Sequence, residues 1–190
     1  MKLLILDNYD SFTYNLAHYF EGMDCKVDVI RNDAISIKEA AHYSHIIISP
    51  GPGLPEQAGI TKALIETYIN TKPMLGICLG YQALAEYFGG TLFNQNEVAH
   101  GIQRKVLRTD AYSWLLKDLP QEFNVGLYHS WAANLNTATA FKPVAIRMNN
   151  VVMAAEHLIL PVAGVQFHPE SIMTPDGRKI LKNWLDRSLA

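Results

Sequence analysis

The stretch Leu75-Gly76-Ile77-Cys78-Leu79-Gly80 decides the fold of this chain. Pro73–Ile77 is a short apolar run typical of a buried strand, and a helix is expected to follow it and to end at Gly89-Gly90. Only Cys78 separates these two elements, so the chain must turn sharply between them. The pattern Gly-x-Cys-x-Gly is the thiol version of a nucleophile elbow, in which such a turn lifts a reactive side chain above the edge of a sheet. The two glycines have a steric reason, because the strand and the helix lie too close there for side chains.

The residues before this turn alternate between short apolar runs and amphipathic segments. Strands are expected at Lys2–Leu6, Lys26–Ile30 and Ile46–Ser49. The helices expected between them are one that Asp10 or Ser11 caps, a short one with the capping-box pair Ser36 and Glu39, and one with Ile60, Ala63, Leu64 and Tyr68 on its apolar face. This order predicts an α/β fold with an open, mostly parallel central sheet and helices on both faces. Sites in such sheets form at the carboxyl ends of the strands.

The second half of the chain has a different pattern, with little helix between its apolar runs. These runs lie at 91–95, 104–108, 123–128, 144–148, 151–155 and 162–167. We expect them to be antiparallel strands that extend the sheet. A final helix is expected near 175–188, with Thr174 as its cap and Pro175 in its first position. The sequence has no repeat, low-complexity tract or linker, so residues 1–190 are expected to form one domain.

Composition and charge exclude several classes of function. The 190 residues carry a formal charge of −2, which provides no basic field for nucleic acid. The basic cluster of the last helix, Arg178 to Arg187, contains Asp186 and follows Asp176, so we interpret it as a solvated face. Asp7 interrupts the first apolar run, so neither a secretory segment nor a membrane span is expected there. Two cysteines cannot form a disulfide framework, and we expect a cytoplasmic protein with reduced thiols.

Cys78 is the candidate nucleophile, because a helix N-terminus favours the thiolate. The alternative is that Cys78 is a small core residue, as we expect for Cys25. A cysteine nucleophile needs an imidazole base that a third group orients. His168 meets this requirement, because Pro169 fixes the backbone between it and Glu170. His129 is the rival base.

The glycine-rich loop Pro50–Pro55 follows the third expected strand. Its tandem glycines free backbone N–H groups to approach a ligand. One such N–H, together with that of Leu79, would form an oxyanion hole. The alternative is an ordinary surface loop. His42 and His45 have no further nearby ligand, so we expect no metal site.

Taken together and in this order, these segments resemble the class I glutamine amidotransferases of the Cys-His-Glu type. The similarity is greatest to the branch that serves chorismate-using enzymes, namely the small subunits of anthranilate synthase and aminodeoxychorismate synthase. The matching residues are Leu4–Leu16, Ser49–Gly53, Pro55, Glu56, Ala58–Ile60, Gly76–Gly80, Gln82, Ala83, Tyr128–Ser130, Gly164–Ile172, Thr174 and Gly177.

This resemblance implies a mechanism and a set of roles. Cys78 would attack the side-chain carboxamide of L-glutamine, with His168 as acid and base and Glu170 as its orienting group. The amides of Gly53 and Leu79 would hold the oxyanion. The residues implied to grip glutamine are Gly51, Pro52, Gly53, Gln82, Ser130 and Trp131, and His129 would belong to the glutamine-holding turn. No cofactor is implied. Ammonia would pass to a larger chorismate-binding synthase subunit in a heterodimer or heterotetramer.

Several positions depart from the family pattern. Tyr81 replaces a histidine, Leu127 an arginine and Trp131 a leucine, and Ile102-Gln103-Arg104 replaces Lys-(Thr/Ser)-Ser. None is a triad residue, but those at 102–104 and 127 bear on partner docking. The departures at 102–104 leave open a non-catalytic regulatory subunit as the alternative. An unrelated elbow-cysteine hydrolase or peptidase is a third reading. Tryptophan synthesis is favoured over folate synthesis, and one small subunit can serve both.

Overall fold

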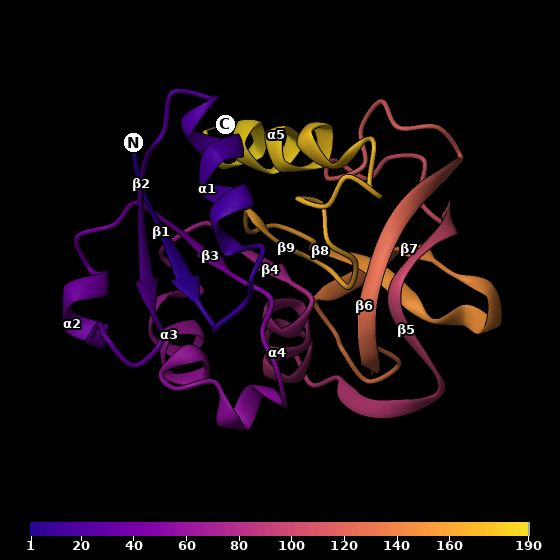
Figure 1. The fold of residues 1–190 in the computed structure, drawn as a ribbon, viewed down its shortest axis with the longest axis horizontal. Helices are drawn as coiled ribbons and strands as arrows, with labels where there is room; N and C mark the ends of the chain where they lie inside the picture. The colour runs from indigo at the N-terminus through magenta and orange to yellow at the C-terminus, as the bar shows by residue number, and fades with distance from the viewer. Residues whose placement is uncertain (190) are drawn as a thin grey trace.

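One mixed sheet runs through the molecule (Figure 1). The computed structural model of the chain describes residues 1–189, apart from the side chains of residues 96–99. Within this part, nine strands form the sheet in the order β2-β1-β3-β4-β9-β8-β7-β5-β6. The strands are β1 Lys2–Asp7, β2 Lys26–Arg31, β3 His45–Ile48, β4 Met74–Ile77, β5 Thr91–Arg108, β6 Glu122–Asn134, β7 Phe141–Ile146, β8 Val152–His157 and β9 Val162–Val165.

Helices cover both faces of the parallel part of this sheet, as the sequence predicts (Figure 1). The helices are α1 Thr13–Glu21, α2 Ile37–Ala40, α3 Thr61–Tyr68, α4 Leu79–Tyr87 and α5 Gly177–Ser188, with short 3-10 turns at Pro55–Gln57 and Met148–Asn150. Side chains of α1 and α5 share one buried apolar cluster with β1. Those of α2, α3 and α4 form a second cluster on the opposite face. Burial of these two apolar faces is the main stabilising contribution to the α/β arrangement.

The first half of the chain agrees closely with the sequence-based expectations. Strands β1, β2, β3 and β4 pair in parallel, and Ser36 and Glu39 form the expected reciprocal capping box. The expected cap of α1 is wrong, because Phe12 occupies the N-cap position and no side chain caps the helix. The Asp10 carboxylate instead accepts a hydrogen bond from the Phe12 N–H (3.1 Å), which shapes the turn just before the helix.

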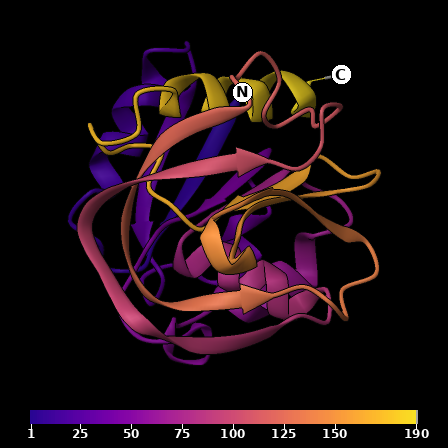
Figure 2. The same ribbon diagram turned by 90° about the vertical axis from the view of Figure 1, so that its right-hand side faces the viewer.

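The second half departs further from expectation. The runs at 91–95 and 104–108 are one long strand, β5, which pairs with β6 through register shifts between residues 94 and 102. This hairpin curves around the end of the sheet that faces the viewer in Figure 2. Strand β9 was expected to be antiparallel, but it lies parallel to β4 and antiparallel to β8. It thereby returns the chain from the antiparallel strands to the centre of the sheet, beside the cysteine turn.

The final helix begins at Gly177, later than predicted, and Asp176 rather than Thr174 is its N-cap residue. Thr174 is used elsewhere: its hydroxyl donates to the carbonyl of His168 (2.7 Å) and accepts from the N–H of Gly126 (2.9 Å). Thr174, which local spacing predicts to be a helix cap, therefore connects the His168 segment to β6 through hydrogen bonds. Long-range contacts of this kind leave no trace in local sequence patterns.

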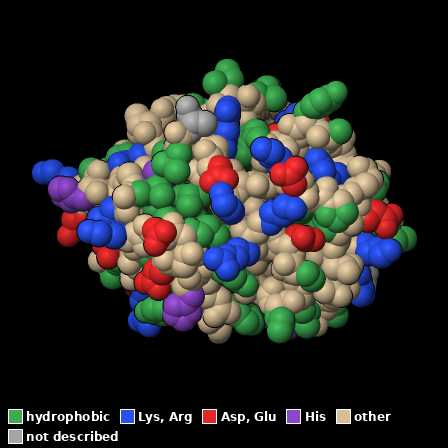
Figure 3. Space-filling model, turned by 90° about the horizontal axis from the view of Figure 1, so that it is seen from above, with side chains coloured by type: hydrophobic (Ala, Val, Ile, Leu, Met, Phe, Trp, Pro, Cys, Tyr) green, Lys and Arg blue, Asp and Glu red, His purple; other side chains and the backbone are tan. Residues whose placement is uncertain are grey.

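The outer surface of α5 carries charges of both signs. Lys182 pairs with Asp186 one helical turn away (2.6 Å), and all four of its basic residues are exposed. Figure 3, which looks down on this face, shows blue and red side chains interspersed, with no single sign gathered in one place. This is the solvated face that the sequence predicts. Across the described residues, no helix is long and apolar enough to cross a membrane.

Tyr81 occupies the core beneath β9. Its ring is fully buried beside Phe141, at a centroid distance of 6.2 Å. The ring also packs against Gly164 in β9, where a Cβ would lie only 2.7 Å from it. The Tyr81 hydroxyl is buried and has no hydrogen-bond partner among the described residues. Burial also raises the pKa of this phenol far above its ordinary value, so the hydroxyl stays neutral.

We expect Tyr81→Phe to increase the free energy of unfolding by about 1 kcal/mol, because it removes a buried polar group without a partner. Urea denaturation of the two proteins measures the difference. Tyr68→Phe is the matched control: the Tyr68 hydroxyl donates to the carbonyl of Ile37 (2.7 Å), so its removal is expected to lower stability by about 1 kcal/mol. A clear loss of stability in Tyr81→Phe would contradict the assignment of an unpaired hydroxyl.

Candidate active site

The turn at Cys78 is as tight as the sequence predicts. Cys78 has φ 51° and ψ −102°, a conformation that side chains disfavour and that marks functional turns. A Cβ on Gly76 would lie 2.5 Å from the backbone of Gly80, and a Cβ on Gly80 would lie 2.3 Å from the carbonyl oxygen of Ile48. Both glycines are therefore required by the close approach of α4 to β3 and β4.

Cys78 is anchored by its backbone on both sides. Its N–H donates to the carbonyl of Val165 in β9 (2.8 Å), and its carbonyl accepts from the N–H of Gln82 in α4 (3.0 Å). The side chain is only 6% exposed. A buried thiol on a strained, doubly anchored turn is held in one position, at the carboxyl end of β4 and the N-terminus of a helix. This is the position expected for a nucleophile of the elbow type.

His168 and Glu170 form a buried pair. The Nδ1–H of His168 donates to a Glu170 carboxylate oxygen at 2.6 Å. The His168 side chain is 3% exposed and that of Glu170 is wholly buried. Because an ionised carboxylate only accepts, the pair fixes the imidazole in the tautomer or charge state that carries a proton on Nδ1. Nε2 is then the ring atom available for chemistry.

Electrostatics favour the protonated imidazole. Burial alone lowers the pKa of His168, but interactions with Cys78 and with Glu170 outweigh it and raise the pKa well above its ordinary value. The Nε2 atom has no hydrogen-bond partner within the described part of the chain. The His168 residue lines the same cavity as Cys78. Catalytic hydrogen bonds often close only when substrate binds, so this open geometry is compatible with an acid–base role.

The segment that carries this pair is held against β6. The N–H of His168 donates to the carbonyl of Gly126 (3.1 Å), in addition to the Thr174 bridge. A Cβ on Gly177 would lie only 1.8 Å from the carbonyl oxygen of Pro169, so α5 begins in direct contact with the bend between His168 and Glu170. The final helix therefore supports the imidazole from behind.

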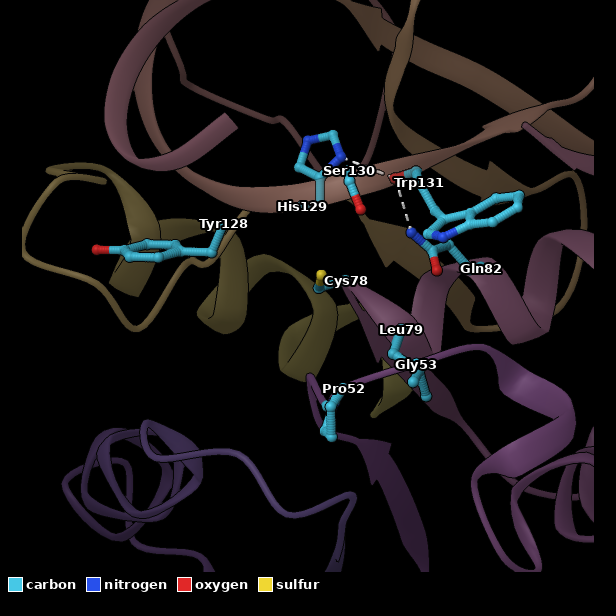
Figure 4. Close-up of a pocket in the computed structure, with 10 residues that line it drawn as sticks. Pro52, Gly53, Cys78, Leu79, Gln82, Tyr128, His129, Ser130 and Trp131 are labelled. Atoms are coloured by element: carbon cyan, nitrogen blue, oxygen red, sulfur yellow. Dashed lines mark hydrogen bonds between the residues drawn. The ribbon is translucent and has the colours of Figure 1, made fainter. Parts of the chain in front are cut away.

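A pocket of about 250 Å³ opens on one side of Cys78. Figure 4 shows Cys78 between the segment of residues 128–131 and the loop that contains Pro52 and Gly53. The lining residues are Gly51, Pro52, Gly53, Cys78, Leu79, Gln82, Tyr128, His129, Ser130 and Trp131. All of the residues predicted to hold glutamine or its oxyanion thus line one pocket together with Cys78. Their roles stay predictions.

Gln82 has a fixed orientation in this pocket. Its Nε2 donates to the carbonyl of Trp131 (2.9 Å) and to the Oε1 of Gln166 (3.2 Å). Because a backbone carbonyl can only accept, the nitrogen must face Trp131. The Gln82 oxygen points away from Trp131 (Figure 4) and is left to accept a hydrogen bond from a ligand.

The glycine loop rests on a buried polar network that sequence reasoning missed. The Asn8 side chain donates to the carbonyl of Ser49 (3.0 Å), and its oxygen accepts from Asn32 (2.9 Å) and Thr61 (3.0 Å). A Cβ on Gly51 would lie 2.4 Å from the carbonyl oxygen of Asn8. Asn8 therefore ties the ends of β1, β2 and β3 to the loop. The signal was the polar residue directly after the first strand, since the side chain of Asn8 bonds only to residues distant in sequence.

Gly53, one of the two predicted oxyanion donors, has a backbone conformation that favours glycine. Its φ is +76°, in the left-handed region where other residues are strained. Leu79 is the first residue of α4, so its N–H has no acceptor within the helix. Both residues line the pocket beside Cys78.

His129, the rival base, lies within β6. Its Nδ1 is 2.8 Å from the carbonyl oxygen of Trp131 and 3.0 Å from the amide nitrogen of Gln95. Burial lowers the pKa of His129 to about 4, so the imidazole is neutral at physiological pH. The dashed lines of Figure 4 show His129 and Gln82 meeting at the same carbonyl of Trp131. His129 is thereby built into the wall of the pocket.

A second cavity of about 370 Å³ meets the first at Cys78. Its lining combines the N-terminal string with the imidazole side of the site: Tyr9, Asp10, Ser11, Phe12, Pro50, Gly51, Pro52, Cys78, His100, Tyr128 and His168. The sequence predicts only a helix cap at Asp10 or Ser11 within the string Tyr9–Phe12, and no part in the site. The structure places this string in the lining of this cavity, where the centroid of the Phe12 ring lies 6.2 Å from that of the His168 imidazole.

The departures from the family pattern make contacts within the chain. Ile102 lies opposite Leu127 in the ladder between β5 and β6, and Leu127 is fully buried. The Gln103 amide donates to the carbonyl of Met173 (2.8 Å), just beyond the His168 segment. Two of the replaced positions therefore form one apolar cross-strand pair.

Comparisons with known proteins agree with this geometry. The family described as glutamine amidotransferase class I matches residues 4–188. The Haemophilus influenzae protein named "Putative anthranilate synthase component II" is 45% identical over 186 residues, which cover 97% of this chain and 96% of that protein. Anthranilate synthase component 2 of Azospirillum brasilense is 41% identical over 188 residues, with coverage of 97% and 95%.

A solved structure supports the fold. It is the "putative gmp synthase subunit a protein" of Thermoplasma acidophilum, which superimposes with a TM-score of 0.88 and covers 100% of this chain and 94% of its own. Its sequence identity is 24%, so this likeness concerns the fold alone. The family match extends over nearly the whole chain. The chain belongs to the class I glutamine amidotransferases.

Proposed function

We propose that this chain is the glutaminase subunit of anthranilate synthase: it hydrolyses L-glutamine at Cys78 and passes ammonia to a larger, chorismate-binding synthase subunit. The observation that carries the proposal is the position of Cys78 between two cavities. One is lined by backbone and amide groups that suit a small polar substrate, and the other holds the His168 imidazole. The names of the curated relatives favour the anthranilate branch.

Catalysis begins with attack of the Cys78 thiolate on the side-chain carbonyl carbon of glutamine, which forms a C–S bond. The oxygen becomes an oxyanion, for which the N–H groups of Gly53 and Leu79 are the proposed donors. His168 gives its Nε2 proton to the amide nitrogen, the C–N bond breaks, and ammonia leaves a thioester on Cys78. His168 then takes a proton from water, whose hydroxide attacks the thioester and releases glutamate and the thiol.

Each proposed group supplies a distinct part of the rate. One oxyanion donor is typically worth about 3 kcal/mol of barrier, and a positioned acid–base group about 10²–10⁴-fold. Glu170 acts through His168, whose proton it holds on Nδ1. The raised pKa of His168 keeps the imidazolium available to protonate a leaving amide. The strained turn keeps the sulfur at the mouth of both cavities.

The second cavity supports an exit route for ammonia. While the glutamyl group occupies the first pocket, the second cavity offers ammonia a way out on the side of His168. That side is rimmed by the exposed ring of Tyr9 and by Phe12 and Tyr128. We therefore expect the synthase subunit to cover this rim. The same role in aminodeoxychorismate synthase is the alternative, and co-purification with each large subunit, followed by identification of the aminated product, decides between them.

Cys78→Ala is expected to abolish glutamine-dependent product formation by the assembled synthase, since no thioester can form. Ammonia-dependent synthesis by the large subunit is expected to persist. Cys25→Ala, at the other buried cysteine, is the matched control and should retain both activities. Steady-state product formation with glutamine or with ammonium salt measures this. Loss of both activities in Cys78→Ala would show a structural role instead.

We expect the isolated subunit to hydrolyse glutamine slowly and the synthase subunit to accelerate it, because hydrolysis without an acceptor wastes glutamine. Ammonia release is measured with and without the partner. Equal turnover in the two cases would contradict coupling. A rate with partner no higher than that of Cys78→Ala would favour a regulatory subunit, and turnover of peptides or esters with glutamine ignored would favour an unrelated hydrolase.

His129 should make stability depend on pH in a defined direction. Its folded-state pKa is about 4, below the ordinary 6.5, so its contribution is complete above pH 6.5 and is lost as the pH falls toward 4. The loss amounts to at most about 3 kcal/mol. His129→Gln keeps a donor for the Trp131 carbonyl and should remove this part of the pH dependence. Denaturation at pH 7 and 4.5 measures it, with the exposed His42→Gln as control. An equal change in the free energy of unfolding between pH 7 and 4.5 in wild type and His129→Gln would refute the assignment of this pH dependence to His129.

A further inference from the structure

Gln166 is a fully buried carboxamide that the mechanism above does not use. It follows β9 directly, two residues before His168, and its backbone N–H donates to the carbonyl of Met153 (2.9 Å). Its side-chain Nε2 lies 3.7 Å from the Sγ of Cys78, and its Oε1 accepts from Gln82. Both polar ends of a fully buried side chain therefore face residues of the candidate site.

The orientation of Gln166 follows from a backbone carbonyl. The carbonyl of Trp131 can only accept, which places the Gln82 nitrogen toward it and gives that nitrogen one further proton to donate. The acceptor of that proton is the oxygen of Gln166 (3.2 Å). The Gln166 nitrogen must then be the end that faces the sulfur. These contacts form a relay from the Trp131 carbonyl through Gln82 and Gln166 to the Cys78 sulfur, and the relay has one consistent assignment of donors and acceptors.

A donor aimed at the sulfur favours the charged form of a cysteine. A thiol is a weak acceptor, whereas a thiolate is a strong one, so this contact strengthens when Cys78 ionises. The contact also holds the sulfur from the β9 side. At the other end of the relay, Gln166 helps to fix Gln82 so that its oxygen stays free for a ligand.

We propose that Gln166 is a further active-site residue, which stabilises the Cys78 thiolate through its Nε2 and positions Gln82 for substrate through its Oε1. The inference rests on the proposed function for its role in turnover, but its effect on Cys78 is independent of any substrate. The contacts between the two glutamines and the sulfur link the nucleophile, Cys78, to Gln82, the group proposed to bind substrate, through one buried series of hydrogen bonds.

The test is the pH dependence of Cys78 alkylation by iodoacetamide, followed by peptide mass spectrometry. Gln166→Glu keeps an acceptor for Gln82 but presents an oxygen to the sulfur. We expect the pH of half-maximal alkylation to rise by about 1–2 units, as loss of a hydrogen bond to a charged group implies. Gln166→Met should also raise it. Gln121→Glu is the matched control: this exposed amide donates to the carbonyl of Arg108 (2.7 Å) and should leave the midpoint unchanged.

Steady-state kinetics with the synthase subunit separate the two ends of the relay. Gln166→Glu should lower kcat about tenfold or more with KM for glutamine nearly unchanged, and Gln166→Met should also raise KM. An unchanged alkylation midpoint in both variants, with the thermal unfolding temperature lowered, would overturn the inference and leave Gln166 a packing residue. A wild-type complex without glutaminase activity would overturn the proposed function instead, while the alkylation result would stand.

The native chain offers a second measurement that needs no substitution at a buried site. The side-chain amide signals of Gln166 in a ¹⁵N-labelled sample are followed as the pH is varied. We expect them to shift with the same midpoint as Cys78 alkylation, because the amide senses the charge on the sulfur. Signals that do not move through that midpoint would contradict the contact.

Discussion

The close approach of α4 to β3 and β4 is the constraint on which the site depends. It requires glycine at 76 and 80 and forces Cys78 into a conformation that side chains disfavour. Strain of this kind typically costs about 1–3 kcal/mol and persists only when the surroundings over-determine it. Here the parallel ladder from β3 through β4 to β9 fixes the turn, because a carbonyl of β9 accepts a hydrogen bond from the Cys78 N–H.

The two halves of the sheet supply different parts of the site. The parallel half provides the cysteine turn, the glycine loop and the Asn8 network beneath it. The antiparallel half provides the pocket wall at residues 128–131. The segment after β9 brings His168 and Gln166 to the cysteine, and Thr174 and Gly177 hold that segment against β6 and α5. A single sheet thus allows residues far apart in sequence to meet around one sulfur atom.

Local patterns predicted what local physics decides. The strand before Cys78, the capping box at Ser36 and the paired His168 and Glu170 each follow from neighbouring residues, and the structure contains all three. The parallel placement of β9, the bridge made by Thr174 and the relay through Gln166 depend on pairings across the fold. No residue adjacent in sequence reports them. The same holds for Tyr81, whose hydroxyl has no partner among residues 1–189 as far as they are described, which only its surroundings reveal.

The central claim is that glutamine is hydrolysed through a covalent intermediate on Cys78. The most direct measurement is an acid quench of the assembled enzyme during turnover of glutamine, followed by mass spectrometry of the peptide that contains Cys78. The account predicts a glutamyl thioester on Cys78 and none on Cys25. If Cys78 still attacks glutamine when His168 is replaced by alanine, the thioester accumulates further in that variant. Glutamate production by the wild type with no acyl group on Cys78, or continued production by Cys78→Ala, would contradict the account.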